Sequence, residues 1–346
     1  PLSFFEHKES RKLDRYTMFA MIAADQAIKS SGLDSSDVGV ILGTGVGGMN
    51  TLEEEHTKLL KKGQRGVSPH FIPKMIPNIA GGQIAIKHGF HGPNFSLSTA
   101  CSSASDAIGM AYRLIQSNQI HAMVCGGAEG GITPLTLSGF SNMKALSKNN
   151  ENPQNACKPF DKNRDGFIMS EGSAMLILES LDSAQKRGAN ILAEIIGYGI
   201  TNDAYHITQP HNEGVGATSA INLALKDGGI NKDEVSYINA HGTSTYYNDM
   251  IETKAIKQVF GGDIAKNLLV SSTKSMTGHM LGATGAIEAI TCIYAMNNGI
   301  IPPTINYETP DPECDLNYVP NKSIESDLNI TISNSFGFGG HNSVLA

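Results

Sequence analysis

Apolar positions along this chain recur at two spacings, which predicts helices interleaved with short buried strands. Positions 12–31 and 102–116 carry apolar residues three and four apart, the spacing that puts them on one face of a helix. In the first half of the chain, buried strands are predicted at 38–42, at 95–98 and up to Val124, where a glycine-rich turn at Gly126-Gly127 follows. A chain that alternates in this way is typical of an α/β protein.

The second half repeats this plan after a seam near 180–190. Helices are predicted at 215–227, 249–260 and 280–297, and strands at 191–196, 235–240, 267–271 and 329–333. Each half contains a strand–turn–helix unit, around Leu97–Cys101 and Val270–Lys274. The repeated unit indicates an internal duplication, although too few residues are identical between the two units to prove one.

Composition and charge narrow the class of protein. With 40% hydrophobic and 17% charged residues over 346 positions, the chain can bury a large core and is not a disordered one. Its net charge of −7 argues against a dedicated nucleic-acid binder. No stretch approaches the roughly 20 apolar residues that cross a bilayer. The chain opens on Pro1, so a targeting segment cannot be judged.

Five cysteines are spread along the chain without a CxxC pair, which favours a reduced compartment over a disulfide framework. Cys101 lies between a predicted strand and a predicted helix, among small residues that leave room beside its sulfur. The free N–H groups and partial positive charge of a helix N-terminus favour a thiolate there. A small buried cysteine that only fills space is the alternative, and this segment alone leaves both open.

Two histidines favour the catalytic interpretation. His241 directly follows the predicted strand 235–240, and His279 ends the run Lys274-Ser-Met-Thr-Gly-His279 just before a helix. Singly, each histidine is more often a hydrogen-bonded structural residue. Together with Cys101 they supply a nucleophile and two imidazoles, which is a set of groups used in acyl transfer.

Glu288 stands out because its helix is apolar or small on nearly every side. A buried carboxylate needs a partner, for which Lys274 and the histidines are candidates; a glutamate on an exposed stripe is the alternative. The C-terminal run Asn334-Ser-Phe-Gly-Phe-Gly-Gly340 allows a tight loop whose N–H groups can face a ligand oxygen. Taken alone, that run is equally a plain loop with two core aromatics.

Two other patterns are dismissed as sites. The run Gly43–Gly48 lacks the full spacing and the following acidic residue of a dinucleotide-binding loop. Asp161–Gly166 matches the first half of a calcium-binding loop, but Gly172 occupies the twelfth position, where such a loop needs Glu. No metal-ligand spacing is present. The sequence therefore predicts neither a metal nor a bound cofactor.

Four motifs in order resemble the β-ketoacyl synthases, and more narrowly their type II elongating branch. The motifs are Thr99-Ala-Cys101-Ser, Asn239-Ala-His-Gly-Thr-Ser-Thr245, Lys274-Ser-Met-Thr-Gly-His279 and Asn334-Ser-Phe-Gly-Phe-Gly-Gly340. The resemblance runs through nearly the whole chain, including Gly126-Gly-Ala-Glu129 and Arg164-Asp-Gly-Phe167. One departure is Tyr246-Tyr-Asn248, where the family has a small Pro-x-Gly, which puts the shape of the pantetheine tunnel in doubt.

The resemblance implies a thiolase-like fold of five layers and a homodimer. Its two similar α/β halves would be residues 1–185, which carry the nucleophile, and residues 186–346, which carry the histidines. It also implies roles in fatty acid synthesis. Cys101 would take an acyl group from acyl carrier protein, and His241 and His279 would promote the decarboxylation of malonyl-carrier protein.

The remaining roles are implied in the same way. Lys274 and Glu288 would fix the protonation and orientation of His279. The N–H groups of Cys101 and Phe338 would form the oxyanion hole, with Phe338 also gating the acyl pocket. Phosphopantetheine, carried by the partner and not held as a cofactor, would contact Thr243 and Thr245. The implied docking positions for the acidic carrier protein are Lys8, Arg11, Lys12, Arg65 and Lys144; ordinary solvated side chains are the alternative for each.

Rival interpretations of the same fold are weaker. A degradative thiolase would use a second cysteine near its C-terminal loop, whereas Cys292 lies in a predicted helix and Cys314 in a proline-rich loop. A catalytically silent, chain-length-setting partner subunit would lack the nucleophile. The family's setting is the cytoplasm, with import into an organelle left open because the N-terminus is incomplete.

Overall fold

Two β-sheets organise the chain, which the computed structural model describes from Pro1 to Ala346. The first sheet has the order β2-β1-β3-β4, with β1 parallel to both neighbours and β4 antiparallel to β3. Its strands are β1 (Gly39–Gly43), β2 (Asn94–Leu97), β3 (Ala122–Glu129) and β4 (Gly172–Glu179). Every residue of β1 and β3 is buried, so these strands are covered on both faces.

The second sheet has the order β5-β11-β10-β6-β7 and contains the C-terminus. Its strands are β5 (Tyr198–Asn202), β6 (Val235–Asn239), β7 (Leu269–Ser271), β10 (Ile330–Gly337) and β11 (His341–Leu345). A separate two-stranded pair joins β8 (Ile300–Ile301) to β9 (Ile324–Glu325). The parallel strands β6, β7 and β10 end on the same side of this sheet, which is where a site can be assembled.

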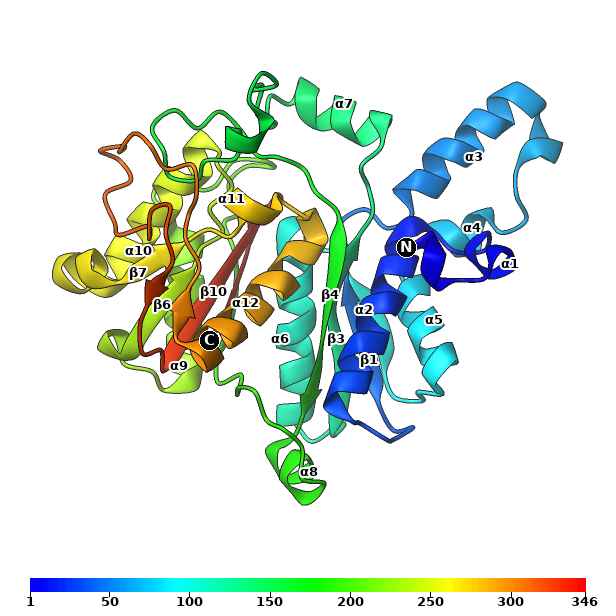
Figure 1. Ribbon diagram of the computed structural model, residues 1–346, viewed down its shortest axis with the longest axis horizontal. Coiled ribbons are helices and arrows are strands. Elements are labelled where there is room, and N and C mark those ends of the chain that lie inside the picture. The colour runs from blue at the N-terminus through cyan, green and yellow to red at the C-terminus, as the bar shows by residue number, and fades with distance from the viewer.

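Helices complete five layers, as Figure 1 shows. Helices α2 (Arg15–Ser31) and α5 (Ile79–His88) cover the outer face of the first sheet, and α9 (Val215–Gly228) and α10 (Tyr246–Asn267) flank the second. Between the sheets lie α6 (Ser103–Gln116) and α12 (Thr284–Asn298). The shorter or protruding helices are α1 (His7–Ser10), α3 (Met49–Lys62), α4 (Phe71–Met75), α7 (Pro134–Asn142), α8 (Leu181–Lys186) and α11 (Lys274–Thr277).

Small residues let the two central helices approach each other closely. A side chain on Gly285 of α12 would lie 2.0 Å from the Ser105 hydroxyl of α6, so only glycine fits there. Ser105 in turn hydrogen-bonds Ser335 of β10 across 2.7 Å. These contacts fix the start of α6, directly after the turn that holds Cys101, against both α12 and the second sheet.

The predicted strand 191–196 is wrong. Residues 190–196 form no strand, and β5 begins two residues later, at Tyr198. Ile191 and Leu192 are about half exposed, and the N–H of Ile196 pairs only with the carbonyl of Ala346. The apolar run resembles a strand, but it has no neighbouring strand to pair with.

Two predicted loops are instead parts of strands. Gly126 and Gly127 lie inside β3 and form no turn after it; a side chain on Gly126 would approach the carbonyl of Ala174 on β4 to 2.2 Å. The glycines therefore permit close packing within the sheet. Likewise β10 continues through Gly337, so the predicted C-terminal loop is reduced to the turn before His341.

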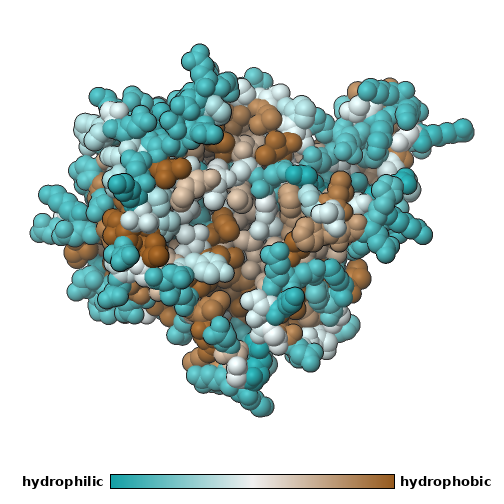
Figure 2. Space-filling view, viewed as in Figure 1, coloured by the Kyte–Doolittle hydropathy of each residue, from teal (hydrophilic) through white to brown (hydrophobic).

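None of the helices is both long and apolar enough to cross a bilayer. On the face drawn in Figure 2, hydrophilic residues line the rim and apolar residues gather toward the middle.

Candidate active site

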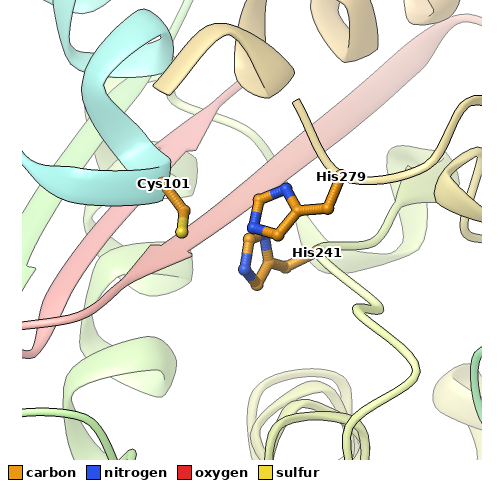
Figure 3. A group of neighbouring side chains, drawn as sticks. All are labelled: Cys101, His241 and His279. Carbon is orange, nitrogen blue, oxygen red and sulfur yellow. The ribbon is translucent and has the colours of Figure 1, made fainter. Parts of the chain in front are cut away.

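Three side chains from distant parts of the chain meet between the two halves (Figure 3). Cys101 lies in the single 3-10 turn Ala100–Ser102 that leads into α6. His241 follows the end of β6, and His279 lies between α11 and the 3-10 turn Leu281–Ala283. The sulfur and one ring nitrogen of each histidine all lie within 4.8 Å of one another. The structure therefore brings together the three residues that the sequence predicts as catalytic.

The turn before Cys101 has an unusual backbone that local hydrogen bonds hold. Ala100 has φ +52°, in the left-handed region that residues other than glycine rarely adopt. The Ser103 hydroxyl donates to the Ala100 carbonyl across 2.6 Å and accepts from the N–H of Thr99 across 2.9 Å. This conformation presents the sulfur to the histidines while the helix begins at Ser103.

The resting ionisation of Cys101 differs from the sequence-based expectation. Burial raises the pKa of its thiol to about 12, although the charge of Lys274 and the N–H groups of Phe338 and Cys101 favour the thiolate. Loss of hydration outweighs the effect of these groups on the thiol pKa. Cys101 is therefore a thiol at rest, and its proton must leave when the sulfur attacks.

Both imidazoles are neutral at physiological pH. Burial lowers the pKa of His241 and of His279 well below the ordinary value, and the nearby charge of Lys274 lowers both further. The rings pack edge to face, with their centroids 5.4 Å apart. A neutral imidazole carries one N–H donor and one acceptor, so each ring can stabilise developing negative charge without carrying charge itself.

Thr284 orients His279, a contact that sequence reasoning missed. Its hydroxyl lies 2.9 Å from Nδ1 of His279. When the hydroxyl donates to Nδ1, the ring proton is on Nε2, the atom left to face the substrate. Thr284 is the first residue of α12, five positions after His279, and its only signal in the sequence is this proximity.

For the reaction that the resemblance implies, we expect Thr284→Val to lower the rate of malonyl decarboxylation by about tenfold, because it removes the hydroxyl that fixes the ring proton of His279 while keeping the side-chain shape. The decarboxylation rate of malonyl-carrier protein measures this effect directly. Thr291→Val, the same change farther along α12, is the matched control. Equal rates for the Thr284 variant and wild type would contradict the role given to Thr284.

Lys274 and Glu288 form a fully buried pair behind the histidines. Their Nζ and Oε1 atoms lie 2.5 Å apart, and both side chains are inaccessible to solvent. Burial raises the pKa of Glu288 to about 7, against the opposing effect of Lys274. The predicted burial and pairing of Glu288 are thus confirmed. Lys274 acts on His279 through its charge, while the hydrogen bond to the ring comes from Thr284.

Glu252 holds the backbone that carries His241, and it too was missed. Its carboxylate accepts from the N–H groups of His241 and Gly242, at 2.8 Å each, and from the Asn334 amide at 3.0 Å. Glu252 lies on α10, eleven residues after His241, and Asn334 lies on β10. Nothing in the local sequence pattern marks Glu252 as more than a helical glutamate.

Phe338, predicted to contribute an N–H to the oxyanion hole, lies in the turn between β10 and β11, beside the Cys101 turn. The turn between β10 and β11 packs on the Cys101 turn so closely that a side chain on Gly337 would meet the Thr99 carbonyl at 2.6 Å. The backbone N–H groups of Phe338 and Cys101 both lower the pKa of the Cys101 thiol, against the larger effect of burial. The Phe338 ring is half-buried, 6.5 Å from that of Phe140. These two N–H groups can donate to one oxygen beside the sulfur.

Thr243 and Thr245, the predicted pantetheine contacts, directly follow His241 in the loop between β6 and α10. The Thr243 and Thr245 hydroxyls lie 2.8 Å apart, with Thr243 buried and Thr245 half-buried. Arg164 fixes this segment from behind by donating to the carbonyls of Thr245 and Tyr246, at 3.2 and 3.0 Å, and its guanidinium is paired with Asp311. Tyr246, which stands where the family has a small residue, is the first residue of α10. Its side chain is half exposed, so its bulk extends toward solvent and the helix still begins there.

The five predicted docking residues are all exposed and come from three places on the surface. Lys8 lies on α1, with Arg11 and Lys12 directly after it, because the first long helix begins at Arg15 and not at position 12 as predicted. Arg65 follows α3, and Lys144 follows α7. None of them is engaged in an ion pair within the chain.

The cluster of Cys101, His241 and His279 is also the one group of side chains that could hold a metal ion. A thiolate and two imidazoles are donors that Zn²⁺ accepts. A metal bound there would occupy the lone pairs of the sulfur and of both rings. The expectation that the chain uses no metal or bound cofactor stays a prediction.

Comparisons with known proteins agree with this geometry. Residues 2–184 match the family described as "Beta-ketoacyl synthase, N-terminal domain", and residues 192–308 match its C-terminal domain. The "3-oxoacyl-[acyl-carrier-protein] synthase 2" of Synechocystis sp. is 53% identical over 348 residues, which cover 99% of this chain and 83% of that protein.

Solved structures share the fold. A type II polyketide ketosynthase, solved in complex with its acyl-carrier protein and bound to the hexaketide, has a TM-score of 0.93 and 36% identity, over 96% of this chain and 84% of that one. The ishigamide ketosynthase/chain length factor has a TM-score of 0.91 and 33% identity, over 96% and 82%. The predicted five-layer, thiolase-like fold is thus confirmed.

Proposed function

The chain belongs to the β-ketoacyl synthase family, and we propose that Cys101, His241 and His279 carry out its reaction in the roles derived below. The enzyme is a 3-oxoacyl-acyl-carrier-protein synthase of fatty acid biosynthesis. It condenses malonyl-carrier protein with an acyl chain held on the enzyme and releases carbon dioxide. The observation that carries the roles is the approach of one sulfur and two neutral imidazoles to within 4.8 Å.

The first half-reaction moves the acyl group onto the enzyme. The Cys101 sulfur attacks the thioester carbonyl of acyl-carrier protein, and the thiol proton passes by way of a neighbouring imidazole to the departing pantetheine sulfur. The carbon–sulfur bond to the carrier breaks as the bond to Cys101 forms. Because burial raises the pKa of this thiol, the proton transfer and the attack are coupled.

The second half-reaction makes the carbon–carbon bond. Malonyl-carrier protein loses carbon dioxide, and the electron pair of the broken bond moves into an enolate, whose oxygen accepts N–H donation from His241 and His279. The enolate carbon attacks the Cys101 thioester. The resulting oxyanion is held by the N–H groups of Cys101 and Phe338, and its collapse expels the Cys101 thiolate and leaves the 3-oxoacyl chain on the carrier. The thiolate then takes up a proton from water, which restores the resting thiol.

The test uses malonyl-carrier protein with acyl primers of varied length. Equal amounts of carbon dioxide and of a product two carbons longer than the primer are expected. Carbon dioxide without an extended product would contradict the proposed condensation by Cys101. Extension without an acyl group on Cys101 would contradict its role as nucleophile.

A catalytically silent chain-length subunit is the alternative that the sequence raised. The naming of the Synechocystis relative as a synthase, at 53% identity, favours the enzyme. The presence of Cys101 beside both histidines agrees with it, since such a subunit would not need the nucleophile.

Phe338 is proposed as the gate of the acyl pocket. We expect Phe338→Ala to broaden the range of accepted primers, so that the ratio of rates for the best and the poorest primer falls about tenfold. The product profile from a mixture of primers measures this ratio. Phe95→Ala, on β2 of the first sheet, is the control for losing a half-buried aromatic ring elsewhere in the fold. An unchanged profile in the Phe338 variant would argue against the gate.

Acyl carrier protein is the proposed partner, in keeping with the family and with the carrier bound to the polyketide ketosynthase. Its contacts are proposed at Lys8, Arg11, Lys12, Arg65 and Lys144. A homodimer is proposed because β2 is an edge strand with an unpaired outer side. The cytoplasm is the proposed setting, as the Synechocystis relative is bacterial; that relative lends no support to import into an organelle.

A further inference from the structure

One buried carboxylate beside the site takes no part in the reaction derived above. Glu129 is the last residue of β3 and is completely buried. No arginine or lysine pairs with it, and all of its partners are neutral donors. A buried charge without an ion-pair partner is costly, so the fold must gain something specific from it.

The partners of Glu129 come from both halves of the chain. Its Oε2 accepts from the N–H of Gly45 at 2.7 Å and from the N–H of Gly282 at 3.0 Å. Its Oε1 accepts from the Thr44 hydroxyl at 3.1 Å and from the N–H of Val46 at 3.3 Å. Three of these donors lie on the glycine-rich run Gly43–Gly48. That run binds an anion through its backbone, but the anion is a side chain of the same protein.

Glycines let the segments approach closely enough to share the carboxylate. A side chain on Gly282 would lie 2.2 Å from the nitrogen of Gly45 and 2.8 Å from Oε2 of Glu129. A side chain on Gly45 would lie 2.9 Å from the same oxygen. Any residue larger than glycine would therefore separate the two loops.

One of the two loops adjoins His279 along the chain, and the other is hydrogen-bonded to the segment before Cys101. Gly282 lies in the 3-10 turn that connects His279 to Thr284, whose hydroxyl holds the imidazole. On the other side, the carbonyl of Gly45 accepts from the Ser98 hydroxyl at 3.3 Å, in the segment that ends at Cys101. The carboxylate thus links the turn carrying the nucleophile to the turn carrying His279.

Glu129 does not serve to ionise the nucleophile. Its negative charge raises the pKa of Cys101, which works against a thiolate. Burial raises its own pKa to about 7, and the N–H groups of Gly45, Gly282 and Val46 are the main opposing influence. Its carboxylate oxygens are already occupied by four donors, so it has no free atom for a substrate.

We propose that Glu129 is a positioning residue, which joins the glycine-rich loop to the turn after His279 and so sets the separation between Cys101 and His279. This inference rests on the proposed function of those two residues. A displacement of about 1 Å in a reacting group can cost roughly 10²-fold in rate. Decarboxylation, which needs the His279 ring in place, is the step that should suffer most.

The test separates the two half-reactions in the whole protein. Acyl loading of Cys101 is measured as the gain in the intact mass of the enzyme after incubation with acyl-loaded carrier protein and no malonyl-carrier protein. Decarboxylation is measured as the release of carbon dioxide from malonyl-carrier protein. Rates are expressed per Cys101 that iodoacetamide alkylates, so that misfolded protein does not count. Glu129→Gln weakens the carboxylate that accepts from both loops. Gly282→Ala adds a side chain that pushes the turn after His279 away from Gly45 and from the Glu129 carboxylate.

Glu179→Gln is the matched control. Glu179 ends β4 at the opposite end of the same strand pair, where it accepts from Arg187 and Ser183 far from the site. The expected result is a fall of about tenfold or more in decarboxylation for both test variants, with acyl loading changed less than about threefold. The control should change neither rate by more than about twofold.

Equal losses in both half-reactions, or no loss in either test variant, would overturn the positioning role of Glu129. Should only one of the two test variants fold, its ratio of decarboxylation to loading decides the question. A wild-type protein that neither loads an acyl group nor releases carbon dioxide would instead refute the proposed function. The two failures are therefore distinguishable.

Discussion

Cys101→Ala is expected to abolish condensation, with the rate of 3-oxoacyl product formation falling by on the order of 10⁴-fold or more. The variant lacks the sulfur that must hold the acyl chain while malonyl-carrier protein enters. No other thiol can replace it, because the remaining four cysteines are buried in the core and Cys101 alone is partly accessible. Product formation from a fixed primer and malonyl-carrier protein measures the loss.

The control for this variant is Cys125→Ala. Cys125 lies on β3 within the apolar core between the sheets, so the same change there should cost stability of about 1 kcal/mol and leave condensation near the wild-type rate. Normal product formation by the Cys101 variant, with a normal chain length, would refute the nucleophile.

His279→Ala is expected to lower malonyl decarboxylation by about 10²–10⁴-fold, the contribution typical of a positioned acid–base group. Acyl loading of Cys101 should fall much less, because the sulfur and the two N–H donors proposed for the oxyanion hole remain. The physical reason is that the enolate oxygen loses one of its two neutral donors. Carbon dioxide release and intact mass give the two rates separately.

His121→Ala provides the comparison, since His121 is exposed and lies before β3, away from the site. It should change neither rate. A His279 variant that lost acyl loading and decarboxylation by the same factor would show that this ring serves the sulfur as much as the enolate, and the division of roles proposed here would fail.

The sequence predicted the layers well because each central element has a strong local pattern. The apolar run that became β1 and the spaced apolar positions of α6 both occur where expected. Where prediction failed, pairing and packing decided the outcome. The run 191–196 has strand-like residues but no partner strand, and Gly126 looks like a turn residue but allows two strands to pack closely.

The sequence predicted the site residues that belong to recognisable motifs. Cys101, His241 and His279 each stand at the end of a recognisable strand or beside a helix, so their types and spacings carried information. Thr284, Glu252 and Glu129 were missed as contributors to the site because each acts through contacts with segments that only the fold brings near. Common residue types on ordinary helices and strands give no local sign of such contacts.

The ionisation state of Cys101 shows another limit of sequence reasoning. Placement at a helix N-terminus favours a thiolate, and the sequence shows that placement. The loss of hydration that raises the pKa of the thiol to about 12 depends on how the folded chain packs around the sulfur, which only the structure shows. The site is consequently neutral at rest, with the thiol and both imidazoles uncharged.

The most direct measurement is to incubate the wild-type protein with carrier protein that holds an acyl group, without malonyl-carrier protein, and to locate the transferred acyl group by peptide mass spectrometry. The account predicts one acyl group per chain, bound as a thioester on the peptide that contains Cys101, and its disappearance when malonyl-carrier protein is added. An acyl group on any other residue, or chain extension with no acyl-enzyme at Cys101, would contradict it.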